Sequence, residues 1–284
     1  MIIFIKGVLG LLAFSFACFF FVDFIKNKKS LSKTGWLGLI GIGFLTNSLD
    51  TLGIGSFATQ TSLFKLFRLV EDRVIPGTLN VGNTIPVVIQ AFIFMTIIKV
   101  EPITFTSMLA AAPIGAVLGA SIVVKLPVRK IQFCLGLALL AVAFTMFMGL
   151  MKLFPSGGNA TGLTAGKLIL ATAVSFILGS LHTIGIGFYA PCMALVYALG
   201  MSPKVAFPIM MGSAAMLMPA ASIKFIKEKA QDRKASMALT LFGILGVLLA
   251  AYIIISLPLT ALKWVVILVM LYTSFTLFKS AKQI

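Results

Sequence analysis

The chain has 284 residues, of which 60% are hydrophobic and 11% are charged, and its mean hydropathy is +1.12. A soluble domain of this length does not have that composition, so an integral membrane protein is predicted. The formal net charge of +16 would suggest nucleic acid as the partner of a soluble protein, but here the basic residues gather in short loops between apolar runs, which is the positive-inside pattern, so we expect the lipid bilayer and no nucleic acid as a partner.

Seven apolar runs follow one another along the chain, each close to the ~20 residues that a membrane-spanning helix needs. They cover residues 2–25, 76–98, 103–124, 131–151, 205–223, 235–255 and 261–278. The first run is too long for the core of a signal peptide, and no clear cleavage site follows it. We therefore expect it to remain as an N-terminal transmembrane helix with its N-terminus outside, because most of the nearby basic residues follow it.

Two further apolar stretches, residues 36–70 and 166–202, are interrupted by glycine and polar residues. Their helical arms are short. Residues 36–47 would extend about 18 Å as a helix, which passes the middle of a ~30 Å hydrocarbon core but does not cross it. Because a bilayer tolerates broken backbone only where it is buried in protein or lines a cavity, these interruptions are candidate functional sites.

The same sequence interrupts both stretches. Residues 48–58 read SLDTLGIGSFA and residues 180–190 read SLHTIGIGFYA, with seven of the eleven positions identical at a spacing of 132. The similarity continues into the following helices, where Pro76 matches Pro208 at the same spacing. The chain therefore carries two copies of one unit, which is an interrupted stretch followed by three helices.

This repeat divides the chain into four parts. An N-terminal helix with its basic loop (residues 1–35) precedes the first repeat (36–153), and a linker (154–165) joins it to the second repeat (166–284). The predicted fold is an all-α integral membrane protein with an inverted repeat. Each half is a broken or re-entrant helical hairpin plus three transmembrane helices.

The basic residues bear on whether the interrupted stretches cross the membrane or turn back. If both turn back as hairpins, 17 of the 23 lysines and arginines lie on one side and 6 on the other, whereas if both cross, the division is 14 and 9. The hairpin arrangement gives the stronger bias and places the C-terminus in the cytoplasm. A hairpin adds no net crossing, so each half crosses the membrane three times, which is an odd number. The two halves are therefore expected to lie inverted relative to each other, with both Gly-Ile-Gly tips near the midplane. The alternative is that these glycines only let helices pack closely.

Two ionisable residues occupy equivalent positions in the repeated sequence. Asp50 is the only acidic residue deep in apolar sequence, and His182 is the only histidine of the chain. Ionisable groups inside a membrane are costly and are functional candidates by default. At the tips, Asp50 and His182 could pair, share a proton, or couple transport to protons or sodium. The alternative is a buried structural pair that holds the hairpins together.

No lysine or arginine lies in the middle of a predicted spanning helix, so an anion at the midplane would be met by backbone N–H groups, hydroxyls and amides. A helix that restarts after each Gly-Ile-Gly offers free N–H groups and the positive end of its dipole. The predicted substrate-binding residues are Asn47, Ser48, Thr51, Gly53, Gly55, Ser56, Thr78, Asn80, Asn83, Thr84, Ser180, His182, Thr183, Gly185, Gly187, Tyr189 and Ser213. No catalytic constellation, metal cluster or nucleotide-binding loop is recognisable, so no enzyme activity, cofactor or metal is expected.

Short motifs of small residues recur in both halves. In the first half they are Gly53-Ile-Gly55, Gly77-Thr78-Leu79, and Pro113–Ala120 leading to Leu126-Pro127. In the second half they are Gly185-Ile-Gly187, Ala190-Pro191, Pro208 and Leu257-Pro258. With these motifs the chain resembles the TauE/SafE family of sulfite and organosulfonate permeases. The resemblance implies a transporter of a small sulfur-containing anion such as sulfite, sulfoacetate or a related organosulfonate, or of a similar carboxylate.

The predicted function is that of a secondary anion transporter of the bacterial inner or plasma membrane, for example a sulfite exporter. It would bind its substrate between the two hairpin tips and work by alternating access. The alternatives are an anion channel, a carrier of small carboxylates and a non-transporting membrane scaffold. The direction of transport, coupling to protons or sodium, and assembly as a homodimer are left open.

Overall fold

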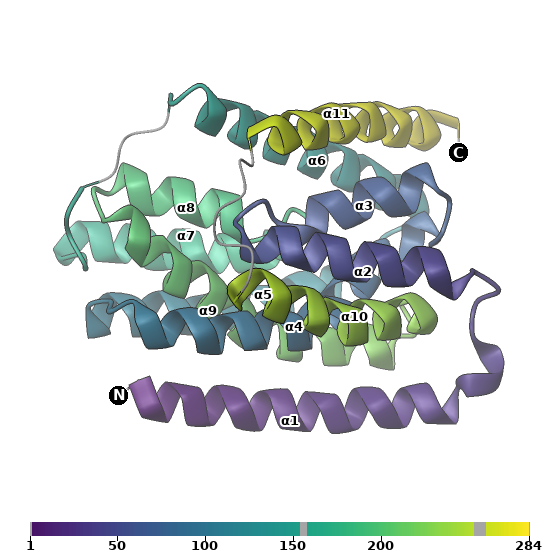
Figure 1. Cartoon of the computed structure of the whole chain (residues 1–284), viewed down its shortest axis with the longest axis horizontal. Coiled ribbons are helices and arrows are strands. Elements are labelled where there is room, and N and C mark those ends of the chain that lie inside the picture. Colours follow the sequence, from purple (N-terminus) through teal and green to yellow (C-terminus); the bar gives the residue numbers. More distant parts are fainter. Residues whose placement is uncertain (1, 154–157, 253–259, 284) are drawn as a thin grey trace.

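The computed structural model describes residues 2–153, 158–252 and 260–283. All regular secondary structure within these residues is helical, and six of the helices are long and apolar enough to cross a membrane. The prediction of an all-helical protein with several helices of membrane-spanning length and composition is therefore confirmed. The long helices run roughly alongside one another in one bundle (Figure 1).

The helices agree closely with the predicted runs. In chain order they are α1 (Ile2–Lys26), α2 (Trp36–Thr51), α3 (Ser56–Leu66), α4 (Ile75–Ile97), α5 (Pro102–Val123), α6 (Val128–Leu150), α7 (Ala165–His182), α8 (Tyr189–Ala198), α9 (Pro203–Lys227), α10 (Arg233–Tyr252) and α11 (Thr260–Gln283), with short 3₁₀ helices η1 (Lys28–Ser30) and η2 (Asp72–Val74). Part of the predicted linker (154–157), the end of the predicted run 235–255, and the Leu257-Pro258 motif lie outside the described residues.

The two interrupted stretches are hairpins of short helices. Thr34, just before α2, donates a hydrogen bond from its Oγ1 to the carbonyl oxygen of Leu69, just after α3, over 3.0 Å. Lys167, near the start of α7, donates to the carbonyl oxygen of Leu199, just after α8, over 3.2 Å. Each pair of short helices therefore enters and leaves the bundle at one end, and the two hairpins open at opposite ends (Figure 1).

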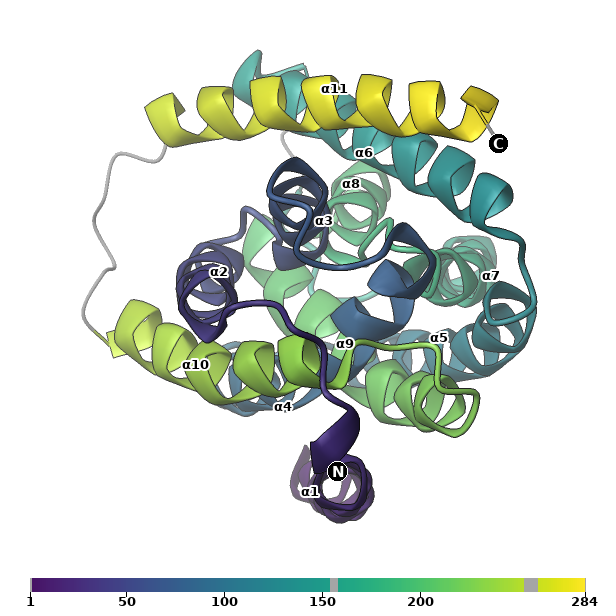
Figure 2. The same cartoon turned by 90° about the vertical axis from the view of Figure 1, so that its right-hand side faces the viewer.

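Most of the close helix pairs join one half of the chain to the other. The hairpin helix α2 packs along α10 and the hairpin helix α7 packs along α5, while α4 packs on α9 and α6 packs on α11. Seen along the bundle, α6 and α11 cover one side, and α1 lies outside the opposite side (Figure 2). Each hairpin is therefore held in place by helices of the other half.

Glycine allows the two hairpin arms to lie close to their partners. A Cβ atom at Gly115 of α5 would lie 1.9 Å from the backbone carbonyl oxygen of Phe176 in α7. A Cβ atom at Gly246 of α10 would lie 2.3 Å from the carbonyl oxygen of Phe44 in α2. Small residues at such crossings bring helix backbones together in membrane proteins, and here they do so at equivalent places in the two halves.

A buried threonine hydroxyl donates a hydrogen bond to a helix carbonyl that a proline leaves without its usual donor. Pro86 lies inside α4 and has no N–H, so the carbonyl of Gly82, one turn earlier, lacks its usual helical donor. The Oγ1 of Thr240 in α10 donates to this carbonyl oxygen over 2.9 Å. The proline therefore creates an acceptor that joins α4 to α10.

The loops divide between the two ends of the bundle. The first end, where the first hairpin opens, holds residues 27–35, 67–74, 124–127 and 228–232. The second end, where the second hairpin opens, holds residues 98–101, 158–164 and 199–202. Hydrogen bonds connect loops within an end: Ser32 donates to Asp232 at the first end over 3.2 Å, and the N–H of Glu101 donates to the carbonyl of Thr161 at the second end over 2.9 Å.

Glu101 caps the N-terminus of α5 at the second end. Its carboxylate accepts hydrogen bonds from the backbone N–H groups of Thr104, over 2.7 Å, and Ile103, over 2.9 Å. These bonds hold the pKa of the carboxyl below its ordinary value. A carboxylate with a lowered pKa stabilises the fold above its unfolded-state pKa and loses that contribution as the pH falls through its folded-state pKa.

We expect Glu101→Gln to lower the melting temperature near neutral pH, because the amide is a weaker acceptor and has no charge to interact with the helix dipole. The difference from the wild type should shrink as the pH falls through the lowered pKa of the Glu101 carboxyl, where the carboxylate becomes protonated in the folded state. Thermal unfolding of both proteins near neutral pH and at a pH well below the ordinary pKa of a glutamate carboxyl measures this. A difference of the same size at both pH values would contradict the capping role.

Candidate functional site

The tips of the two hairpins meet at a cavity of about 60 Å³, here called the tip cavity. The first tip contributes Asp50 and residues 53–58, and the second contributes His182 and residues 186–189. Helices α4, α6 and α9 complete the wall with Val87, Val142, Met146, Ala214 and Met218. Both copies of the repeated sequence therefore face one shared space in the interior of the bundle.

Glycine is required at the tips by the backbone conformation. Gly53 and Gly55 have φ angles of +86° and +88°, and Gly185 and Gly187 have φ angles of +109° and +80°. Residues with a side chain rarely adopt this left-handed region. A Cβ atom at Gly55 would meet nothing within 4 Å. Close helix packing, the alternative reading of the motif, therefore does not explain the glycine at this position.

The helical arm of the first hairpin is longer than predicted. It was expected to end near residue 47, but α2 continues to Thr51, so the start of the repeated sequence is helical. The chain leaves the helix through a tight turn, in which the N–H of Gly53 donates to the carbonyl of Asp50 over 2.9 Å and the N–H of Ile54 donates to the carbonyl of Leu49 over 3.0 Å. The break is therefore confined to the Gly-Ile-Gly segment, because polar residues can remain helical when their side chains find partners.

Asp50 is buried, and both of its carboxylate oxygens accept hydrogen bonds. Oδ1 accepts from the backbone N–H of Ser56, the first residue of α3, over 2.5 Å. Oδ2 accepts from Nε2 of Gln90 in α4 over 3.0 Å. Two N–H donors suit an ionised carboxylate, and a negative charge is also favoured at the N-terminus of a helix. Asp50 therefore occupies the N-terminal end of α3.

Gln90 connects the two tips and was not among the predicted site residues. Its Nε2 donates to Asp50 and, over 3.0 Å, to Thr51, and its Oε1 accepts from the hydroxyl of Tyr189 over 2.6 Å. A sequence signal existed, because Gln90 lies seven positions after Asn83 and therefore on the same face of α4. A lone amide in apolar sequence did not by itself indicate which tip it would contact.

His182 is buried beside the first tip. Its ring packs on Phe57 with a centroid distance of 4.3 Å, and neither of its ring nitrogens has a hydrogen-bond partner among the described residues. Asp50 is linked to Tyr189 through Gln90, and Tyr189 is the equivalent of Phe57. Each ionisable residue therefore associates with the aromatic residue of the opposite tip, which is the pattern expected if a twofold-like relation joins the hairpins.

A direct pair between Asp50 and His182, one of the interactions considered for these two residues, is absent from the described structure. The two residues line the same cavity, but no hydrogen bond or ion pair joins them. Asp50 is instead held by Ser56 and Gln90, which are closer in the chain or on the adjoining helix. Local backbone donors at the start of α3 thus satisfy the carboxylate in place of the imidazole.

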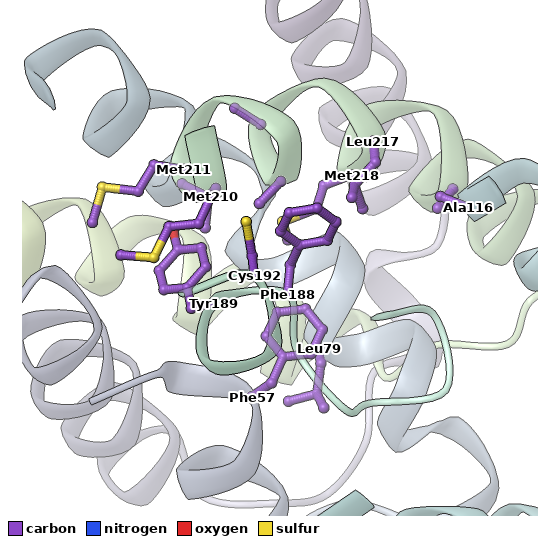
Figure 3. Packing of buried hydrophobic residues seen from close by; sticks show 14 of the residues in the cluster. Phe57, Leu79, Ala116, Phe188, Tyr189, Cys192, Met210, Met211, Leu217 and Met218 are labelled. Atoms are coloured by element: carbon purple, nitrogen blue, oxygen red, sulfur yellow. The ribbon is translucent and has the colours of Figure 1, made fainter. Parts of the chain in front are cut away.

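Aromatic and sulfur-containing side chains surround the tips. Phe57, Phe188 and Tyr189 gather there together with Met210 and Met218 of α9 (Figure 3). Phe57, Phe188 and Tyr189 are all buried. The wall of the tip cavity is therefore mostly apolar, with a few polar groups from the hairpins.

The structure brings some of the predicted residues to the tip cavity and places the others elsewhere. Those that line the cavity are Asp50, Gly53, Gly55, Ser56, His182, Gly187 and Tyr189. Those that lie outside its lining are Asn47, Ser48, Thr51, Thr78, Asn80, Asn83, Thr84, Ser180, Thr183, Gly185 and Ser213. Each of the latter is buried or partly buried within the bundle, and most have structural partners.

One group of these residues forms a network between the first hairpin and α4. Oδ1 of Asn83 accepts from Asn47 over 3.0 Å and from Gln60 over 2.9 Å, and Nδ2 of Asn83 donates to Gln60 over 2.6 Å. Gln60 also donates to Thr46 over 2.8 Å. The amides that were predicted to bind substrate therefore fix α3 against α2 and α4. Gln60 and Thr46, which complete the network, were not predicted.

Ser48 and Ser180 make equivalent contacts between helices. Ser48 donates to the carbonyl of Gly246 in α10 over 3.1 Å, and Ser180 donates to the carbonyl of Gly115 in α5 over 2.7 Å. Both serines thus bond to the glycines at the close helix crossings. Helix packing therefore explains why a serine stands at this position in both copies of the repeated sequence.

The remaining predicted residues have varied surroundings. Thr84 bonds to Ser222 of α9 over 3.0 Å, and Thr78 accepts from the N–H of Asp232 at the first end over 2.8 Å. Thr183 donates to the carbonyl of Ser180 over 2.7 Å. The Oδ1 of Asn80 and the hydroxyl of Ser213 are buried without a partner among the described residues.

A second, larger cleft of about 780 Å³ lies at the first end, where the first hairpin opens. Its basic residues are Lys65, Arg68, Arg73 and Arg233, and its acidic residues are Glu71, Asp72 and Asp232. Lys65 and Asp72 form an ion pair with an N–O distance of 2.5 Å. The cleft is therefore polar, in contrast to the mostly apolar wall of the tip cavity.

No protein-family model matches the chain, and neither a curated protein nor a solved structure matches it. The candidate site is therefore interpreted from the geometry of its residues.

Proposed function

We propose that the protein is a secondary transporter that carries a small anion across a membrane by alternating access. The observation that carries this proposal is the tip cavity, where two hairpins that open at opposite ends of the bundle bring both copies of one sequence to a shared space. Discontinuous helices that meet at the middle of an inverted repeat are the typical substrate site of secondary transporters.

The orientation proposed for the membrane follows from charge. The first end carries 17 of the 23 lysines and arginines when both hairpins turn back, so we place it in the cytoplasm of a bacterial cell. The N-terminus is then outside, the C-terminus is in the cytoplasm, and the two repeats are inverted. The polar cleft at the first end would be the cytoplasmic entrance.

An anion is the substrate that best fits the tip cavity. The α3 and α8 helices begin there, and helix N-termini present N–H groups and positive dipole ends. Among the described residues that line the cavity there is no lysine or arginine to attract an anion by full charge. The resemblance of the glycine and Leu-Pro motifs to the TauE/SafE permeases favours a sulfur-containing anion, with sulfite or an organosulfonate as the first choice and a small carboxylate as the second.

The direction of transport is tied to the energy available. A membrane potential that is negative inside favours the exit of an anion by about 2.3 kcal/mol per charge per 100 mV. Export therefore needs no coupled ion, whereas uptake against this potential needs protons or sodium. Asp50, as the ionisable acid at the tips, is the group at which such coupling would act.

Transport by purified protein in liposomes tests the proposal. We expect labelled sulfite to exchange against unlabelled sulfite on the other side of the membrane, because a carrier returns loaded faster than empty. An anion channel would instead give flux orders of magnitude faster and no such counterflow. A scaffold would move no anion, and this result would refute the proposal.

A disulfide across the tips tests whether they must move apart. The Cβ atom of Phe57 lies 3.6 Å from the position of a Cβ atom at Gly187, and disulfides span Cβ separations of about 3.5–4.5 Å. In a chain whose Cys18, Cys134 and Cys192 are replaced with serine, we expect oxidation of the Phe57→Cys, Gly187→Cys variant to stop exchange. Reduction should restore exchange to the level of the Gly187→Cys single variant, which the φ angle of +80° at this position should already slow. The two single-cysteine variants are the controls. Full exchange by the oxidised double variant would exclude alternating access at the tips.

A further inference from the structure

We infer that the anion binds to the second tip, at the N-terminus of α8 beside His182, and that the ligand is a compact oxyanion the size of sulfite or formate. The inference rests on the proposed function and adds the location and size class of the substrate. It follows from a difference between Asp50 and His182, which occupy equivalent positions in the two copies of the repeated sequence.

At the first tip, the chain supplies its own anion. Asp50 accepts from the backbone N–H of Ser56 at the start of α3 over 2.5 Å, and Gln90 holds its second oxygen over 3.0 Å. The carboxylate thus takes the place that a bound anion would take at a helix N-terminus. A second anion is not favoured there, because it would repel Asp50 and would find the nearest N–H already used.

At the second tip, the equivalent place has no acidic residue. The α8 helix has ten residues, and the side chain of its N-cap residue, Phe188, makes no capping hydrogen bond among the described residues. Its third residue, Pro191, has no N–H, so the donors of its first turn are the N–H groups of Tyr189 and Ala190. This end of α8 lines the tip cavity through Phe188 and Tyr189.

His182 supplies an independent indication of a ligand. Its side chain is 2% exposed and lines the tip cavity, and both ring nitrogens lack a partner among the described residues. Buried polar groups are nearly always hydrogen-bonded, so an unpartnered buried imidazole indicates a ligand or water. An imidazole N–H can donate to an anion that is also bound by the N–H groups of α8.

The volume of the cavity limits the ligand. About 60 Å³ is room for roughly two water molecules, and for an anion of similar size. Drug-sized ligands occupy pockets of about 300–1,000 Å³, so a bulky organic anion does not fit this state of the cavity. The preferred ligand is therefore a compact oxyanion, and sulfoacetate should bind more weakly than sulfite or formate.

Because His182 is the only histidine of the chain, histidine labelled with ¹⁵N in its ring reports on this site alone. The protein must carry a purification tag without histidine. We expect sulfite and formate to shift the imidazole signals in a saturable way, and sulfoacetate to require at least a tenfold higher concentration. The labelled wild type needs no mutation, so this measurement does not depend on whether a variant folds.

Variants at the two equivalent positions complete the test. By ligand-dependent melting temperature, we expect His182→Ala to weaken sulfite binding about tenfold or more, as the loss of a hydrogen bond to a charged group does. We expect Asp50→Asn to strengthen binding several-fold, because it removes a like charge from the same cavity. Asparagine can still accept from Ser56, so the tip should keep its shape.

The outcomes separate this inference from the proposed function. If sulfite is exchanged and raises the melting temperature but leaves the imidazole signals unchanged, the transporter assignment stands and the location at His182 is wrong. If Asp50→Asn abolishes binding and His182→Ala does not, the anion lies at the first tip and the inference is overturned. If no anion is bound or carried by the wild type, both proposals fail.

Discussion

Replacing Gly115 with alanine should separate α5 from α7 and destabilise the protein by about 3 kcal/mol, at the upper end of the usual cost of overpacking. The new Cβ atom would lie 1.9 Å from the carbonyl oxygen of Phe176 and 3.2 Å from the backbone nitrogen of Ser180. Both are backbone atoms within a helix, so neither can turn away as a side chain does. The separation would also break the hydrogen bond from Ser180 to the carbonyl of Gly115, which is 2.7 Å long.

The free energy of unfolding in detergent measures this effect, and two further variants control it. Gly41 lies in α2, and a Cβ atom there would meet nothing within 4 Å, so Gly41→Ala should be neutral or slightly stabilising. Gly246→Ala, at the equivalent crossing of α10 and α2, should behave like Gly115→Ala because its Cβ atom would lie 2.3 Å from a carbonyl oxygen. A Gly115→Ala protein as stable as the Gly41→Ala protein would show that the backbones do not touch.

Some features of this fold could be predicted from the sequence, and others could not. The long helices were predictable to within a few residues, because a spanning helix requires an unbroken apolar run of nearly fixed length. The location of the tips was predictable from the repeated Gly-Ile-Gly, since positive φ angles demand glycine. Both signals are local, because each is carried by the residues of the segment whose structure it predicts.

The direction in which a polar side chain points depends on how its helix is rotated about its own axis. This rotation could not be predicted from the sequence. Ser48 and Ser180 stand in the repeated sequence next to the tips, but Gly246 and Gly115 bring the neighbouring helices so close that both serines face them. A direct pairing of Asp50 and His182 was one of the roles that their equivalent positions suggested. No such pair forms in the described structure, because the first donor of α3 lies nearer to the carboxylate in the chain than the imidazole does.

Substituting Gln90 with leucine should have a similarly large effect, because it leaves two buried polar groups without their partner. Oδ2 of Asp50 would lose its donor and the hydroxyl of Tyr189 would lose its acceptor. Leaving a buried polar group without its hydrogen-bond partner costs about 1–3 kcal/mol and more when the group is charged, and leucine has nearly the volume needed to avoid a cavity. We expect a loss of about 3 kcal/mol in the free energy of unfolding, together with slower anion exchange, since the tips lose their connection.

A similar pair at the edge of the bundle gives a matched control. Gln132 donates to Asp72 over 2.8 Å, but Asp72 also has an ion pair with Lys65 and lies in the polar cleft of the first end. Its charge keeps a partner when the amide is removed, so Gln132→Leu should cost much less than Gln90→Leu. Equal losses in the two variants would mean that Asp50 does not depend on Gln90 for its burial.

A variant that removes both the charge of Asp50 and the amide of Gln90 identifies the cause of the loss in the free energy of unfolding. If the cost of Gln90→Leu arises from an ionised carboxylate left without a donor, then Asp50→Asn should cost less in the Gln90→Leu background than in the wild type. A double-mutant cycle of the two changes should therefore give a coupling free energy of about 1–3 kcal/mol, whereas distant and independent sites are additive within ~0.5 kcal/mol. Additivity would mean that Asp50 is satisfied by the N–H of Ser56 alone, and that Gln90 acts on the second tip through Tyr189. In that case the two tips are linked by packing of their aromatic residues and not by a hydrogen-bonded chain, and a proton or cation at Asp50 would have no direct path to affect the α8 side of the cavity.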